Sequence, residues 1–348
     1  MNHRLSRLRN GLIGLFFLGS VLLPAWYQSS KPRVWILHSY DKNYSWVKDV
    51  NIGIHRVLDG HPELTVNWYY LDTKRHPSSE FKINAGVSMR RMIQAAAPDL
   101  LIAIDDDAQQ YVTRHLLDHP TLRIVFAGVN NQPCDYGFDQ AGNVTGILER
   151  LPLSALRETL LTLADYSGLK KRPITIRFLG DLSETVRGDE KNFRNFDMKP
   201  IQVADSRLVE TFDAWQQAVL ESAGEVDFLI TSNYRKIRRS AESDELVPAR
   251  ELIDWTERHS PVPMIGTNGF FAEDGGMLAI GTSPFEQGEV AARLALELIR
   301  SGESPNQMPL RSTGQFVVAM RTSWLQARHL RLPQVYEAAA RSINKYYE

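Results

Sequence analysis

After residue 31 the chain alternates short strand-like runs with amphipathic helical segments, and no other feature limits its fold as strongly. The strand-like runs are apolar and rich in β-branched residues, whereas the intervening segments repeat apolar residues every three or four positions. This strand–helix order predicts an α/β fold, with a parallel sheet covered by helices on both faces. The predicted strands are Val34–His38, Leu64–Tyr70, Leu100–Ile104 and Leu122–Ala127, and the predicted helices are Ser45–Leu58, Phe81–Ala97 and Ala108–Leu117.

A second series of the same kind begins near residue 150. Ser183–Met198 is polar and charged, so we expect a loop or an irregular helix there. Ser283 and Glu286 flank Pro284 in the pattern of a helix N-cap with a capping box. The sequence therefore predicts two α/β halves, joined near Asn143–Arg150. The strands predicted in the second half are Ile174–Gly180, Pro200–Ala204, Val226–Thr231, Val262–Gly266 and Met277–Gly281.

Residues 1–30 have the composition of a bacterial export signal. Three arginines and a histidine precede the apolar run Gly11–Trp26, and no acid occurs before Asp41. A basic start followed by a short apolar run is typical of export, and the run is shorter than the roughly 20 residues of a membrane-spanning helix. We expect a periplasmic protein, with cleavage after Ala25 or, alternatively, with an uncleaved N-terminal anchor.

The charge and cysteine content exclude several kinds of partner and site. The formal net charge is −1, which argues against nucleic acid as a partner. Cys134 is the one cysteine, so the chain forms no internal disulfide and builds no thiolate zinc site.

Polar residues recur directly after the predicted strands of both halves. In open parallel sheets ligands bind beyond the carboxyl ends of the strands, so these positions are candidates for a binding site. Polar turns at strand ends also occur without any ligand. The sharpest feature is the acidic run Asp105–Asp107. Three roles stay open for it: N-capping of the next helix by Asp106 or Asp107, recognition of a ligand ammonium group, or a metal site.

The sequence lacks the common signatures of catalysis. It contains no GxGxxG after the first strand and no Walker A, GxSxG or HExxH motif. His115 and His119 have helical spacing, but Pro120 indicates a helix end. We therefore expect no catalytic residues, no cofactor and no metal, and an exported α/β enzyme is the least favoured reading.

Several segments in a fixed order resemble the substrate-binding proteins of ABC transporters, in the type I periplasmic-binding branch that includes tryptophan/tyrosine-type proteins and bacterial sensor domains. The resemblance covers most of residues 33–335. Its segments are Ile36–Tyr40 with Trp46, Pro98–Ala103, Ile124–Val129, Asn143–Gly146, Gly288 with Ala291, and Arg331–Pro333.

The resemblance implies two lobes that close on a small polar molecule, which is then delivered to a membrane permease. It implies an N-lobe of 31–148 plus about 277–305, and a C-lobe of 149–276 plus about 306–348. The alternative is a ligand sensor acting on a membrane kinase or cyclase; in either case we expect a monomer. The acidic run departs from the family pattern and favours a cationic or polyhydroxy ligand. The predicted ligand-binding residues are Ser39, Tyr40, Trp46, Asp105, Asp106, Asp107, Asn130, Glu149, Asp181, Asn233 and Asn268.

Overall fold

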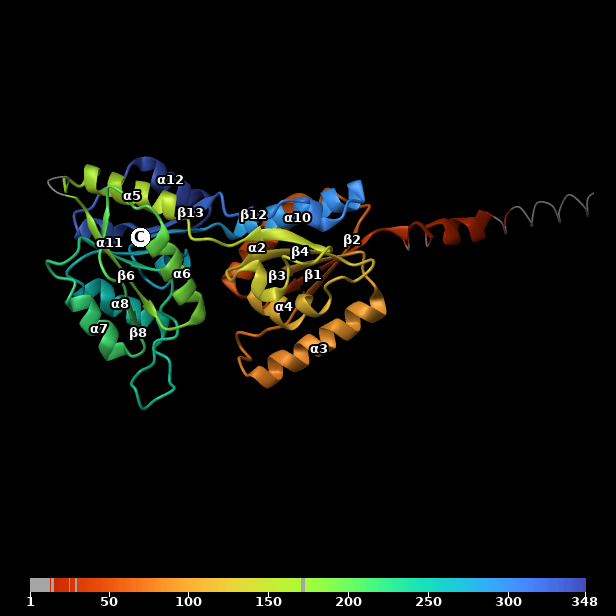
Figure 1. The fold of residues 1–348 in the computed structure, drawn as a ribbon. Coiled ribbons are helices and arrows are strands. Elements are labelled where there is room, and N and C mark those ends of the chain that lie inside the picture. The colour runs from red at the N-terminus through yellow and green to blue at the C-terminus, as the bar shows by residue number, and fades with distance from the viewer. Residues whose placement is uncertain (1–12, 14–15, 25, 29, 170–172) are drawn as a thin grey trace, which may run out of the picture. The chain divides into compact units, whose positions relative to one another are not determined.

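The computed structural model describes residues 13, 16–24, 26–28, 30–169 and 173–348 (Figure 1). The chain divides into two compact units. Unit 1 comprises Met1–Phe126, Tyr136–Gly146 and Ala291–Pro309, and unit 2 comprises Ala127–Asp135, Ile147–Val290 and Leu310–Glu348. The chain thus passes between the units more than once.

Unit 1 is built on a six-stranded sheet in the order β12-β5-β4-β3-β1-β2. Strand β1 lies between β2 and β3 and is parallel to both, with His38 level with Tyr70 and Ile104. Helices α2 and α10 lie on one side of the strands, and α3 and α4 lie on the other (Figure 1). The elements associated with this sheet are β1 (Arg33–His38), α2 (Ser45–Leu58), β2 (Thr65–Tyr70), α3 (Ser79–Ala96), β3 (Leu100–Ile104), α4 (Asp106–Tyr111), η1 (Thr113–His115), β4 (Arg123–Val129), η2 (Pro133–Tyr136), β5 (Val144–Leu148), α10 (Pro284–Ser301), η3 (Pro305–Gln307) and β12 (Arg311–Ser312).

Unit 2 contains an eight-stranded sheet in the order β14-β13-β11-β10-β9-β6-β7, with β8 paired to β6. Its pairings are parallel except that β13 runs antiparallel to β11. One apolar cluster packs α5, α6 and α12 against the strands, and a second packs α7, α8 and α9. The elements are α5 (Leu153–Tyr166), β6 (Thr175–Asp181), α6 (Glu184–Asn195), β7 (Gln202–Val203), β8 (Arg207–Val209), α7 (Phe212–Leu220), β9 (Phe228–Thr231), α8 (Ala249–His259), β10 (Met264–Gly266), α9 (Phe270–Glu273), β11 (Leu278–Thr282), β13 (Phe316–Arg321), α11 (Thr322–Ala327), α12 (Gln334–Ser342) and β14 (Tyr346–Tyr347).

The predicted α/β class, with sheets covered by helices, is confirmed. Three regions differ from the sequence-based expectation. The helix predicted at Ala108–Leu117 is observed as α4, which ends at Tyr111, followed by the short 3-10 helix η1 (Thr113–His115). Ser183–Met198 contains the regular helix α6, whose Val186 and Phe193 are fully buried in the unit 2 core. Strand β11 belongs to the unit 2 sheet, where it pairs with β10 and β13, whereas the expected N-lobe included residues from about 277 onward.

One of the two hydrogen bonds of the predicted capping box before α10 forms. Ser283 Oγ accepts a hydrogen bond from the Glu286 amide at 3.2 Å. The Glu286 carboxylate instead accepts from the amides of Gly314 and Gln315, at 3.0 and 2.9 Å. Glu286 therefore fixes the segment before β13, in addition to lying in the first turn of α10.

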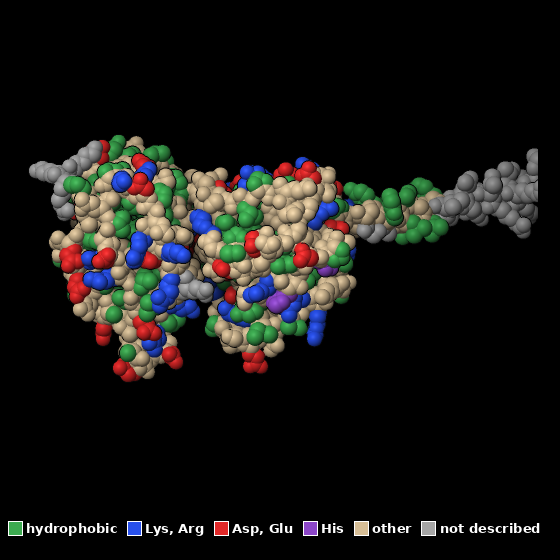
Figure 2. Space-filling view, viewed as in Figure 1, with side chains coloured by type: hydrophobic (Ala, Val, Ile, Leu, Met, Phe, Trp, Pro, Cys, Tyr) green, Lys and Arg blue, Asp and Glu red, His purple; other side chains and the backbone are tan. Residues whose placement is uncertain are grey.

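The apolar N-terminal run is described only in part. Residues 16–24 are helical and their side chains are mostly exposed, as the apolar surface in Figure 2 shows. The basic start of the predicted export signal, residues 1–12, and the expected cleavage point at Ala25 lie outside the described residues. Among the described helices, none has the length and apolar character needed to cross a membrane.

Gly146 in β5 offers a direct test of packing in unit 1. A Cβ atom at this position would meet the carbonyl oxygen of Phe126 and, at 2.5 Å, its Cγ. Because overpacking a core costs about 1–3 kcal/mol, Gly146→Ala is expected to lower the melting temperature by several degrees. Gly60→Ala is the matched control, since nothing lies within 4 Å of the Cβ it adds. Equal melting temperatures for the two variants in differential scanning calorimetry would contradict this packing.

Candidate functional site

The carboxyl ends of β1 and β3 bring several predicted residues of unit 1 together. The amide of Ser39 donates to the carbonyl of Ile104 at 3.2 Å, so Ser39 and Asp105 leave neighbouring strands at the same level. Thr73, after β2, bonds to the carbonyl of Ser39 through its amide at 2.9 Å and its hydroxyl at 2.8 Å. Three strand ends therefore meet at this edge of the sheet.

The buried side chain of Ser39 links β3 to the first turn of α4. Its hydroxyl is fully buried, donates to the Ile104 carbonyl at 2.7 Å and accepts from the Ala108 amide at 2.8 Å. Ser39 thus caps α4 from a neighbouring strand. Of the three roles left open for the acidic run, N-capping by Asp106 or Asp107 is excluded, because Asp105 occupies the N-cap position without a capping bond and the other two lie in the first turn. A ligand contact by Ser39 stays a prediction.

The three acids of the run have different surroundings. Asp107 forms an ion pair with Lys82 at 3.0 Å, and Asp106 accepts from the Tyr136 hydroxyl at 2.7 Å. Asp105 Oδ1 accepts from the indole nitrogen of Trp46 at 2.9 Å. Each acid therefore has a partner far away in the sequence, which explains how three adjacent carboxylates can coexist.

Asp105 is the most unusual residue of this edge. It is 3% exposed, and its Oδ2 is buried without a hydrogen-bond partner in the described part of the chain. Burial raises its pKa well above the ordinary value, and the nearby Lys74 opposes the rise. Its backbone φ of 67° and ψ of 164° fall in a region that residues other than glycine rarely adopt, and such strain is concentrated at functional sites.

Two tyrosines and a lysine lie near Asp105. The rings of Tyr40 and Tyr44 meet edge to face, with centroids 5.6 Å apart. Lys74 Nζ lies 4.1 Å from the Tyr40 ring centroid and 4.0 Å from that of Tyr44, and donates to the Tyr44 hydroxyl at 2.7 Å. Burial raises the pKa of Tyr40 well above its usual value, and the charges of Asp105 to Asp107 add to the rise.

Sequence reasoning missed Tyr44 and Lys74. The rule that located the other candidates, that polar residues after strands gather at one edge, applies equally to the second strand. Lys74 lies four positions after the end of β2, so the same rule would have found it.

The remaining predicted residues lie in unit 2. Asn130 donates to Glu149 at 3.2 Å, so these two lie together. Asp181 is fully buried; it accepts from the Ser183 amide at 2.9 Å and from the Lys236 amide at 3.0 Å.

Asn233 and Asn268 lie at the carboxyl ends of β9 and β10. The side-chain oxygen of Asn233 accepts from the amides of the two following residues, at 2.9 and 3.1 Å. Asn268 donates to the carbonyl of Ser232 at 2.9 Å. Asp181, Asn233 and Asn268 thus shape the turns at this edge of unit 2, and their contact with a ligand stays a prediction.

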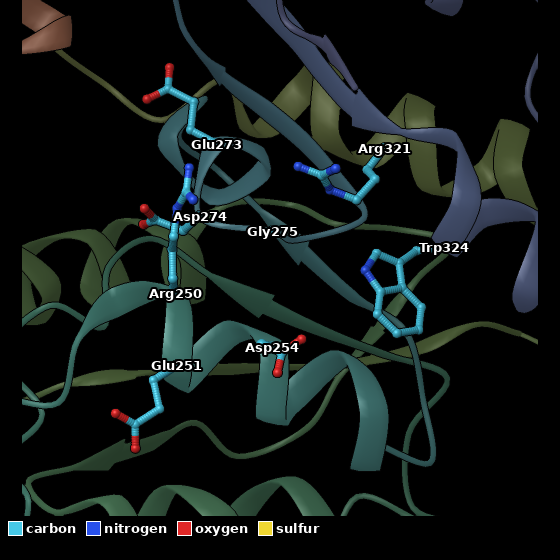
Figure 3. Close-up of a pocket in the computed structure, with 8 residues that line it drawn as sticks. All are labelled: Arg250, Glu251, Asp254, Glu273, Asp274, Gly275, Arg321 and Trp324. Carbon is cyan, nitrogen blue, oxygen red and sulfur yellow. The ribbon is translucent and has the colours of Figure 1, made fainter. Parts of the chain in front are cut away.

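Unit 2 also contains a cavity of about 520 Å³, whose lining includes none of the predicted ligand residues (Figure 3). Each of its acids already has a cationic partner: Glu251 pairs with Arg239, Asp254 with Arg258, Glu273 with Lys345, and Asp274 with Arg235. The lining residues are Arg250, Glu251, Asp254, Glu273, Asp274, Gly275, Arg321 and Trp324. Within the described ranges, no group of three or more histidines, cysteines or acids is arranged to hold a metal ion.

No protein-family model matches the chain, and no curated protein matches its sequence. Solved structures do match. A substrate-binding protein with adhesive properties from Clostridium difficile, in a ligand-free, open structure, has a TM-score of 0.66 at 15% identity, covering 87% of this chain and 96% of that one. An ABC domain in complex with L-Trp from Streptococcus pneumonia has a TM-score of 0.61 at 15% identity, covering 89% and 98%.

A periplasmic ribose ABC transporter from Conexibacter woesei matches with a TM-score of 0.53 at 12% identity, covering 89% of this chain and 97% of that one. At these identities the likeness establishes the fold. The chain therefore has the type I periplasmic-binding-protein fold, with two α/β units.

Proposed function

We propose that this protein captures a small polar molecule outside the cytoplasm and delivers it to an ABC importer. The observation that carries the proposal is the buried Asp105 carboxylate, near Tyr40, Tyr44 and Trp46 at the carboxyl edge of the unit 1 sheet. One of its oxygens has no hydrogen-bond partner in the described part of the chain. Binding sites combine aromatic surfaces with a few polar groups of this kind. Similar solved structures include one bound to L-Trp and one described as a ribose transporter, which supports a small solute.

The proposed binding surface includes Tyr40, Trp46 and Asp105, while Asp181, Asn233 and Asn268 stay predicted contributors from unit 2. The chemistry of the edge is that of recognition. It offers fixed hydrogen-bond acceptors and aromatic faces. Bound solute should therefore be recovered chemically unchanged after incubation.

Binding is tested with the full chain purified from its native periplasm. Native mass spectrometry should reveal a co-purified solute, and adding that solute at 100 times its Kd should stabilise the protein by about 2.7 kcal/mol. Trp46→Phe removes the bond to Asp105 and is expected to reduce the resulting rise in melting temperature. Trp324→Phe, in the cavity of Figure 3, is the matched control and should leave the rise unchanged.

If Trp324→Phe abolishes the rise in melting temperature on solute binding and Trp46→Phe leaves it unchanged, the binding site is that cavity and not the edge of unit 1. If neither co-purified solute nor any added amino acid, sugar or small cation raises the melting temperature, the solute-binding proposal fails. Delivery is tested separately, by measuring uptake of the identified solute in cells lacking this protein. Unchanged uptake would favour the sensing alternative.

A further inference from the structure

The ammonium group of Lys74 lies over two tyrosine rings, and its charge also acts on the buried carboxyl group of Asp105. Its Nζ lies about equally far from the Tyr40 and Tyr44 ring centroids, at 4.1 and 4.0 Å. Cations within about 6 Å of a ring centroid are attracted by the negative face of the ring. The cage formed by these two rings therefore has the geometry of a binding site for a cation, and in this structure the cation comes from the chain itself.

Asp105 is incompletely satisfied in this arrangement. Its Oδ1 accepts from Trp46 at 2.9 Å, while its Oδ2 is buried and has no partner among the described residues. Lys74 is the strongest positive influence on Asp105, yet its hydrogen bond goes to the Tyr44 hydroxyl. Leaving a buried carboxylate oxygen unpaired costs free energy, so a donor that reached it would be strongly favoured.

The other acids of this edge already have partners. Asp107 pairs with Lys82 at 3.0 Å, Asp41 pairs with Arg75 at 2.9 Å, and Asp106 accepts from Tyr136 at 2.7 Å. The unpaired acceptor is thus a specific property of Asp105 and not of the acidic run as a whole.

Lys74 is held in a way that would allow its side chain to leave. The preceding residue, Thr73, is anchored to the Ser39 carbonyl by two hydrogen bonds. Lys74 itself is exposed, and its flexible four-carbon stem carries the ammonium group over the rings. The ammonium group can therefore move out of the cage while the backbone after β2 stays in place.

We propose that this cage recognises a primary ammonium group of the solute, and that Lys74 is an internal stand-in which the solute displaces. This inference rests on the proposed function and narrows it to ammonium-bearing solutes. An ammonium group in the place of Lys74 can donate to the Tyr44 hydroxyl, and its charge suits the faces of Tyr40 and Tyr44 and the nearby Asp105 carboxylate. A neutral hydroxyl could donate to Tyr44 but would not gain the attraction of the rings and of Asp105.

If Lys74 is a stand-in for the solute, removing its ammonium group should raise the affinity for the solute. If the solute ammonium must expel the lysine, Lys74→Met removes a competitor and is expected to raise the affinity about tenfold. If Lys74 instead contacts an anionic group of the solute, the same change weakens binding. Lys48→Met, which removes an exposed lysine from α2, is the matched control and should leave the affinity unchanged.

The test measures binding to the full chain by calorimetry, with probes matched in shape. The amines are 1,4-diaminobutane, L-tryptophan and glucosamine, and their partners without the ammonium group are 1,4-butanediol, indole-3-propionate and glucose. We expect at least one amine to bind and its partner to bind at least tenfold more weakly. Asp105→Asn should weaken binding of the amine at least tenfold. If Asp105→Asn does not fold, Lys74→Met still tests the proposal.

Other outcomes overturn the inference in distinguishable ways. Equal binding of an amine and its partner, or weaker amine binding in Lys74→Met, would reject ammonium recognition in this cage while leaving solute capture intact. Binding confined to glucose or to another compound without an ammonium group would do the same. If no probe and no co-purified solute binds, both this inference and the proposed function fail.

Discussion

Lowering the pH from 7.5 to 4 is expected to cost unit 1 about 3 kcal/mol through His38 alone. His38 ends β1 and is fully buried, and Nε2 lies 2.7 Å from the side-chain oxygen of Asn51. Its Nδ1 is buried without a hydrogen-bond partner among the described residues. The ring stacks on Trp68 and Tyr70. Because a proton on Nδ1 would be a buried donor without an acceptor, this pocket suits a neutral imidazole.

The pKa of His38 explains why the protein loses stability as the pH falls. Burial lowers this pKa from 6.5 to about 3, and the bond to Asn51 only partly opposes this. A group whose pKa is lower in the folded state binds more protons when unfolded. The contribution of His38 is therefore fully present above pH 6.5 and is lost as the pH falls towards 3.

Urea unfolding followed by tryptophan fluorescence between pH 7.5 and 4 measures this loss. His38→Gln keeps a side-chain donor for Asn51 but cannot titrate, so it should flatten the decline in stability. His55→Gln is the matched control: His55 is exposed on α2 and also stacks on Trp68. An acid-induced loss in His38→Gln as large as that of the unchanged protein would contradict the prediction.

Replacing Arg328 with methionine is expected to cost unit 2 about 3–5 kcal/mol at pH 8, because it leaves a buried carboxylate without its cation. Glu257 lies in α8 and is 3% exposed. Its Oε1 accepts from the Met277 amide at 2.7 Å, and its Oε2 lies 3.4 Å from Arg328 Nη2. Arg328 also donates to the Glu257 carbonyl at 2.9 Å, so it joins α8 to the end of α11.

The pH dependence of this site is opposite in sign to that of His38. Burial raises the pKa of Glu257 to about 7, although Arg328 and the Met277 amide hold it down. Because the folded state binds the proton more tightly, the contribution of Glu257 is fully present below about pH 4.5 and is lost as the pH rises through 7. Arg328→Met removes a counter-charge, so its cost should be larger at pH 8 than at pH 5.

Two further variants isolate the charge. Adding Glu257→Gln to Arg328→Met removes the buried carboxylate and should recover much of the stability lost at pH 8. Arg258→Met breaks an exposed ion pair with Asp254 on the same helix and should have little effect. Equal urea midpoints for Arg328→Met and Arg258→Met at pH 8 would show that Arg328 does not balance a buried charge.

The sequence by itself determined the fold class and most of the strands. Leu100–Ile104 is predicted and observed with identical bounds, because a buried central strand is apolar at every position. The N-cap at Ser283 was equally readable, since capping depends on residues within one turn. The helix α6 was harder to predict because its surface is strongly polar, and Val186 and Phe193 are buried only after the unit 2 core has formed.

For the candidate site, the sequence predicted which positions contribute but not which side chains contact one another. The rule on strand ends placed Tyr40 and Asp105 near one edge and the family resemblance added Trp46, but neither could assign the partner of each acid. Those partners are remote: Trp46 and Asp105 are 59 residues apart, and Asp106 and Tyr136 are 30 apart.

Only the tertiary structure decided that Ser39 caps α4, that Lys74 lies over two tyrosines and that one Asp105 oxygen has no partner among the described residues. The physical reason is one of range. Apolar periodicity and helix capping involve residues a few positions apart, so the local sequence predicts them. The partner of a buried charge depends on which distant segments the sheet brings to the same edge.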